Sequence, residues 1–138
     1  MNKGNPVSHT LLKNWSKNSL NKKPKKEADN YKIEFTFTVG EKYPIECTLS
    51  AIEPIGILSL VGMAYLNIPD DKVKTILKYT SENSNSSGTF TVNNGWLVYI
   101  YSRSIDSQNS SDTLIDSMIA EMDSAVLKVA EGVLKLIK

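Results

Sequence analysis

The residue types that most often perform chemistry are scarce in this chain of 138 residues, which has one histidine, His9, and one cysteine, Cys47. A catalytic histidine needs a nucleophile or a carboxylate nearby, and a metal site usually needs several ligands. Cys47 alternates with Ile45 and Leu49 on the apolar side of an expected strand, whereas a reactive thiol needs an accessible, electropositive setting. We therefore interpret His9 as a solvated residue of a mobile N-terminus and Cys47 as a small buried hydrophobe.

Carboxylates that could bind a metal occur in three pairs: Asp70 and Asp71, Asp112 and Asp116, and Glu121 and Asp123. The first pair and Asp112 are expected at helix starts, where the positive end of the helix dipole accounts for them. The sequence contains no Asp-x-Asp-x-Asp-Gly calcium loop and no glycine-rich phosphate loop. Because no nucleophile–base pair is available either, the sequence predicts no enzyme activity, no metal and no cofactor.

A run of lysines near the N-terminus is the other candidate for a functional site: Lys22, Lys23, Lys25 and Lys26. Residues 1–33 carry a net charge of +6 and residues 34–138 a net charge of −5. A basic segment of this kind could contact nucleic acid or anionic lipid. No arginine or aromatic residue interleaves with the lysines, so base recognition is unsupported. We favour an exposed linker over residues 21–30 that is mobile and dispensable for folding, and keep a nucleic-acid-associated regulator as the alternative function.

The elements that would position any site follow from the apolar periods, which predict one α+β domain over residues 31–138, preceded by an N-terminal helix and the basic linker over residues 1–30. A short helix is expected within residues 8–20. Alternation predicts a three-strand meander over residues 31–39, 43–51 and 55–66. A middle helix should follow Pro69, Asn94-Gly95 predicts a hairpin joining residues 89–92 to 96–101, and a long helix should begin at Asp112. The prediction is an antiparallel sheet with helices packed mainly on one face.

A common core is expected where these periods define single faces. Its predicted members come from the expected strands and the expected helices. They are Phe35, Phe37, Ile45, Leu49, Val73, Ile76, Leu77, Ile115, Ile119, Met122, Val126 and Val129.

The strand from Trp96 to Tyr101 is the most informative feature, because both of its faces are apolar. One face has Trp96, Val98 and Ile100, and the other has Leu97, Tyr99 and Tyr101. A single layer of helices covers only one face, and the exposed face of an antiparallel sheet is normally polar. Either the second face is covered by the N-terminal helix, or it contacts a partner, since large exposed apolar patches usually mark interaction sites. We predict that this strand contributes the partner-binding residues, with Trp96 as the anchor.

Three segments of the chain resemble the YbjN-like family, whose fold is shared with type III secretion chaperones. They are Gly62–Pro69, the passage Ile76–Trp96 with Asn83 and the turn Asn93-Asn94-Gly95, and the closing helix from Asp112. The resemblance implies a folded dimer that handles another protein chain, or a regulatory module. The expected function is therefore a non-catalytic protein-binding module of chaperone-like or regulatory type, whose partner is a protein client or a second copy and not a small molecule.

A cytoplasmic location is also expected, without association with a membrane. The longest apolar stretch, Ile55–Leu66, has 12 residues, whereas a helix needs about 20 to span a bilayer. The first residues contain no apolar run of the signal-peptide type. The lone Cys47 cannot form a disulfide within the chain, which fits a reducing compartment.

Overall fold

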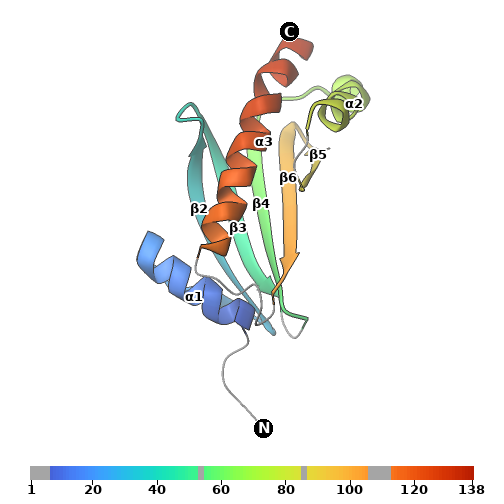
Figure 1. Ribbon diagram of the computed structural model, residues 1–138. Coiled ribbons are helices and arrows are strands. Elements are labelled where there is room, and N and C mark those ends of the chain that lie inside the picture. The colour runs from blue at the N-terminus through green and yellow to red at the C-terminus, as the bar shows by residue number, and fades with distance from the viewer. Residues whose placement is uncertain (1–6, 53–54, 85–86, 106–112) are drawn as a thin grey trace.

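The computed structural model describes residues 7–52, 55–84, 87–105 and 113–138. Its α-helices are α1 (Val7–Leu20), α2 (Val73–Asn83) and α3 (Leu114–Leu136), with a short 3-10 helix, η1 (Asp70–Lys72), before α2. Its strands are β1 (Lys25–Glu27), β2 (Asn30–Val39), β3 (Tyr43–Ile52), β4 (Ile57–Tyr65), β5 (Thr89–Asn93) and β6 (Trp96–Ser104). The predicted α+β class is confirmed: the strands form one antiparallel sheet, and α3 lies along it (Figure 1).

The strand order in the sheet is β1-β2-β3-β4-β6-β5. Strands β2, β3 and β4 form the predicted meander, and β6 then pairs with β4 across the connection that contains α2. The predicted hairpin joins β5 to β6, with Asn93 opposite Trp96. Asn94 and Gly95 both have positive φ angles, 49° and 91°, which is the conformation that a type I′ turn requires. This topology places β4 and β6 side by side in the interior of the sheet.

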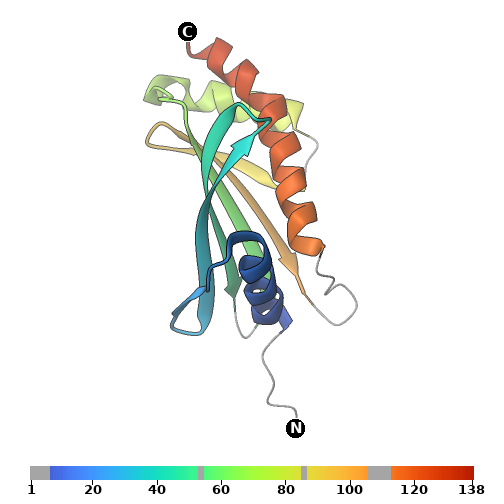
Figure 2. The same cartoon turned by 90° about the vertical axis from the view of Figure 1, so that its left-hand side faces the viewer.

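Helices α1 and α3 cover the same face of the sheet (Figures 1 and 2). Strand residues that point toward them are buried, so that β3 alternates between buried side chains such as Ile45 and Leu49 and exposed ones such as Glu46. On α3 the buried positions recur with helical period, including Ile115, Met118 and Met122. Alternation in strands and the helical period of α3 thus bury their apolar residues in one layer between sheet and helices.

The structure buries most of the predicted core. Buried members form two clusters and not one common core: Ile45, Leu49, Ile115, Ile119, Met122 and Val126 lie in the main cluster, and Ile76 and Val129 lie in a second one. Phe35 and Phe37 are partly buried and pack against the main cluster, and Val73 packs in the same way against a second cluster beside α2. Leu77 is half-buried, because it lies at a recess between α2 and β5.

The N-terminal region is more closely attached to the domain than the sequence suggested. Leu11, Leu12 and Trp15 of α1 belong to the main core. The chain leaves α1 through Asn21, whose positive φ of 52° turns it back, and residues 25–27 then pair with β2. The predicted linker over residues 21–30 therefore contains a strand. No helix in the described part of the chain is long and apolar enough to cross a membrane.

Candidate protein-binding face of the sheet

The face of the sheet that none of the described helices covers has an apolar centre, built by outward-pointing residues of β4 and β6. The strand register places three pairs of side chains next to one another: Val61 and Ile100, Met63 and Val98, and Tyr65 and Trp96. We call these six residues the apolar strip. They share one face because residues two apart in a strand point the same way.

Exposure along the apolar strip varies between its members. Tyr65 and Ile100 are the most exposed, with 57% and 39% of their surface accessible, whereas Val98 at its centre is 6% accessible. The other three are half-buried. The rings of Tyr65 and Trp96 lie 5.2 Å apart at 59°, and the Tyr65 hydroxyl lies 3.0 Å from Asn67 Oδ1, to which it donates a hydrogen bond. The strip is therefore an apolar surface with two ordered aromatic rings at one end.

Polar residues surround the apolar strip on both sides. On β3, Glu46 and Thr48 lie opposite Met63 and Val61. On β5, the threonines at positions 89 and 91 lie opposite Ile100 and Val98. Beyond Val61 and Ile100 the next pair is polar, with a hydrogen bond of 3.0 Å between the Ser59 and Ser102 hydroxyls. An apolar centre inside a polar rim is the usual anatomy of a protein–protein interface.

The six predicted partner-binding residues divide between the two faces of β6. Trp96, Val98 and Ile100 lie in the apolar strip. Leu97, Tyr99 and Tyr101 lie under the helices with accessible fractions of 2%, 0% and 7%, so they are core residues and are not open to a partner. The prediction contained both sets because a strand with two apolar faces does not indicate which face the helices cover.

Half of the apolar strip was missed from the sequence, namely Val61, Met63 and Tyr65 of β4. A signal for them existed, because the stretch Ile55–Leu66 is apolar on both faces. What the sequence lacked was the pairing of β4 with β6, which brings two strands of the same character together.

His9, one of the residue types that often perform catalysis, is packed within the fold. The ring of His9 is half-buried and stacks on Tyr31, with centroids 3.5 Å apart and 12° between planes. The interpretation of His9 as a solvated residue is therefore wrong, because α1 packs against the sheet. In the described part of the chain no group of three histidine, cysteine, aspartate or glutamate side chains could hold a metal ion.

Three of the carboxylates accept hydrogen bonds that join elements of the fold. Asp116 Oδ1 accepts from Trp15 Nε1 at 2.9 Å, and Asp123 Oδ1 accepts from the Gly40 amide at 2.8 Å. Glu121 accepts from the Ser87 amide at 2.7 Å, and this hydrogen bond lowers the pKa of the Glu121 carboxyl. Asp112 lies outside the described residues. These acidic side chains thus link α3 to α1, to the β2–β3 turn and to the chain before β5.

Cys47 is 2% accessible, and burial raises the pKa of its thiol to about 12. The predicted burial as a small hydrophobe is therefore confirmed. Since the thiolate is the reactive form, we expect an aromatic disulfide reagent at pH 8 to modify Cys47 only when the protein unfolds. The measurement is the rate of thiol modification in buffer and in denaturant. Rapid modification of the folded protein would contradict the buried position of this strand.

The sequence matches no protein-family model and no curated protein. Its fold is similar to that of a chain in the structure of the HopA1–SchA chaperone–effector complex, with a TM-score of 0.52 and 16% sequence identity, over 98% of each chain. At this identity the likeness concerns the fold, which this chain shares with a component of a chaperone–effector complex along nearly its whole length.

Proposed function

We propose that this protein is a non-catalytic, chaperone-like binding module that holds another polypeptide against the apolar strip. The observation that carries the proposal is the strip itself, six apolar side chains on a sheet face that no described helix covers. Full burial of a large apolar side chain is worth about 1.5–3 kcal/mol, and Tyr65 and Ile100 are the members with most surface still to bury. The shared fold with a chain of a chaperone–effector complex supports a protein as the partner.

The partner that the strip would bind is a second copy or a client. A second copy would bury two strips in one two-fold symmetric contact, which is the commonest arrangement of soluble oligomers. A client would present apolar residues to the same surface. Membership of the YbjN-like family, with a dimer as its working form, is part of the proposal and is supported by the three segments that resemble that family.

The test replaces the two most exposed members of the strip, in the variant Tyr65→Lys/Ile100→Lys. If the strip is an interface, the two substitutions should weaken association at least 100-fold. Each one removes a large apolar side chain from the contact and places a charge there. The matched control is Thr36→Lys/Thr38→Lys, which adds the same charge to the same face at exposed positions of β2. Light scattering measures self-association, and circular dichroism checks that both variants are folded.

A photo-crosslinking residue, p-benzoylphenylalanine, identifies the occupant when placed at Ile100 or, as the control, at Lys128, an exposed position of α3. We expect an adduct with a second copy or with another protein at Ile100 and none at Lys128. A monomeric parent without an Ile100 adduct would contradict the proposal, as would equal adducts at the two positions.

A further inference from the structure

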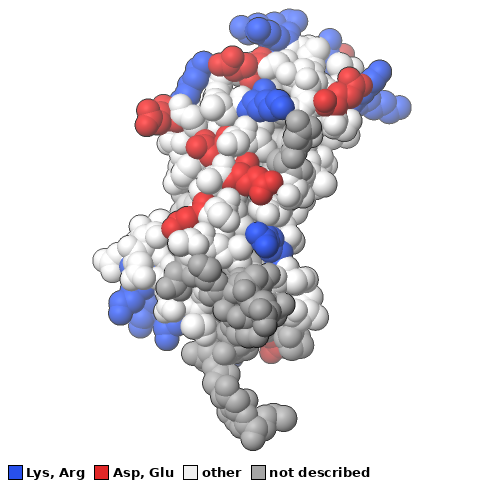
Figure 3. All heavy atoms as spheres, in the orientation of Figure 1, with Lys and Arg blue, Asp and Glu red and all other residues white. Residues whose placement is uncertain are grey.

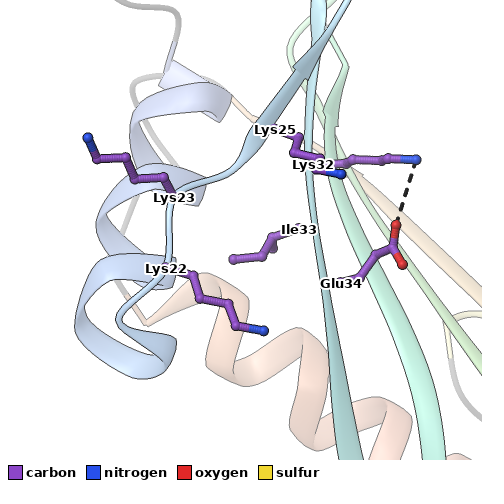
Figure 4. A pocket seen from close by; sticks show the side chains of 6 residues that line it. All are labelled: Lys22, Lys23, Lys25, Lys32, Ile33 and Glu34. Atoms are coloured by element: carbon purple, nitrogen blue, oxygen red, sulfur yellow. Dashed lines mark ion pairs between the residues drawn. The ribbon is translucent and has the colours of Figure 1, made fainter.

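A basic recess lies at the margin of the sheet, away from the apolar strip. It has a volume of about 250 Å³, and its walls are Lys22, Lys23, Lys25, Lys32, Ile33 and Glu34 (Figure 4). The first two come from the connection after α1, the third from β1 and the others from β2. Figure 3 shows basic side chains at both ends of this view, the α1 end among them, with acidic side chains over the middle.

The backbone that presents these lysines is held in place. The Lys22 amide donates a hydrogen bond of 3.2 Å to the Ser16 carbonyl, and the Asn21 amide donates one of 3.2 Å to the Lys17 carbonyl. Three residues later, Lys25 pairs with Lys32 in the β1–β2 ladder. The connection is thus fixed at both ends, to α1 and to the sheet, so little backbone freedom remains to be lost on binding.

The charges in the recess are unevenly compensated. Lys32 Nζ lies 3.0 Å from Glu27 Oε1 and 3.8 Å from Glu34 Oε1, and the hydrogen bond with Glu27 raises the pKa of Lys32. For the other three lysines the described residues provide no carboxylate within 4.0 Å. Three ammonium groups therefore line the recess without an ion pair to any described residue.

We propose that the recess binds an acidic segment of a polypeptide, whose carboxylates pair with Lys22, Lys23 and Lys25. A polypeptide fits this margin better than a nucleic acid, because the lining residues include no arginine and no aromatic ring on which a base could stack. In addition, β1 pairs with β2 only as far as Lys32. The β2 edge beyond it has no other strand partner among the described residues, and such an edge can pair with a peptide backbone.

The test is a titration of the isotope-labelled protein, followed through its amide NMR signals. The probes are a short oligoglutamate peptide, an oligoglutamine peptide of the same length, and an oligothymidylate of the same charge. We expect oligoglutamate to shift the amides of Lys22, Lys23 and Lys25 and of residues 33–34, with an affinity that falls as salt is added. Oligoglutamine should shift none of them.

The decisive variant is Lys22→Gln/Lys23→Gln/Lys25→Gln, for which we expect roughly tenfold weaker oligoglutamate binding, since each exposed pair contributes modestly. The matched control, Lys74→Gln/Lys128→Gln/Lys135→Gln, removes the same charge from exposed positions on α2 and α3 and should change affinity less than about twofold. The apolar-strip variant Tyr65→Lys/Ile100→Lys should bind oligoglutamate as the parent does. The proposal for the recess can therefore fail without the proposal for the apolar strip, and the reverse also holds.

Three outcomes would overturn the inference. Equal weakening in both lysine variants would mean that only net charge matters. Amide shifts elsewhere, or no saturable shifts at all, would mean that the recess is not a site. Tighter binding of oligothymidylate with the same lysine dependence would assign the recess to nucleic acid.

Discussion

Replacing Trp15 with alanine is expected to destabilise the domain by about 3–5 kcal/mol, the usual cost of removing a large buried aromatic side chain. Trp15 is 8% accessible, and its ring lies 5.3 Å from that of Phe35. Its indole N–H also donates to Asp116, so the variant loses this hydrogen bond as well as the packing. Urea unfolding followed by circular dichroism measures the change.

The matched control on the same helix is Lys13→Ala, at an exposed position, which should change stability by less than about 0.5 kcal/mol. If Trp15→Ala also cost less than about 1 kcal/mol, α1 would be a separable unit. Deletion of residues 1–29 would then be harmless, as the predicted boundary at residue 30 requires. The contacts of α1 with the sheet lead us to expect the reverse.

Replacing Tyr99 with alanine is expected to cost a similar amount, about 3–5 kcal/mol. Tyr99 is fully buried, and its ring lies 5.2 Å from that of Phe90 and 6.4 Å from that of Tyr101. A Cβ atom at Gly88 would overlap this ring, so the neighbouring chain approaches Tyr99 closely and cannot fill the cavity without moving its backbone.

The adjacent residue provides the control, because Ile100 points to the opposite face of β6. Ile100→Ala should cost less than about 1 kcal/mol in the monomer, since 39% of the Ile100 surface is already accessible. Equilibrium unfolding of the two variants at low protein concentration makes the comparison. Similar losses for both would mean that Ile100 is as covered as Tyr99, and that the apolar strip is core.

The sequence predicted those elements whose own residues have a strong period. Alternation from Tyr31 to Val39 fixed β2 and its inward face, and Asn94-Gly95 fixed the hairpin, because a type I′ turn needs positive φ at both positions. Strand β1 was missed, since Lys25–Glu27 has no apolar residue and becomes a strand only through pairing with β2. Its structure comes from tertiary contact and not from local preference.

Only part of the candidate site could be predicted, because the site depends on contacts between segments that are far apart in the sequence. The apolar character of β6 was visible, but the strip also needs Val61, Met63 and Tyr65, which reach β6 across the connection that contains α2. Which face of β6 becomes core depends on where α3 packs. A one-residue shift in pairing would have exchanged the two faces, and the period alone does not set that register.

The hydrogen bond between Trp15 and Asp116 joins residues that are 101 positions apart, which has a consequence for synthesis of the protein. At about 5–20 residues per second, the ribosome adds Asp116 roughly 5–20 s after Trp15. During that interval this hydrogen bond cannot form, and α1 can contact only the strands that precede α3. The contact between α1 and α3 is therefore completed only after every strand of the sheet has been synthesised.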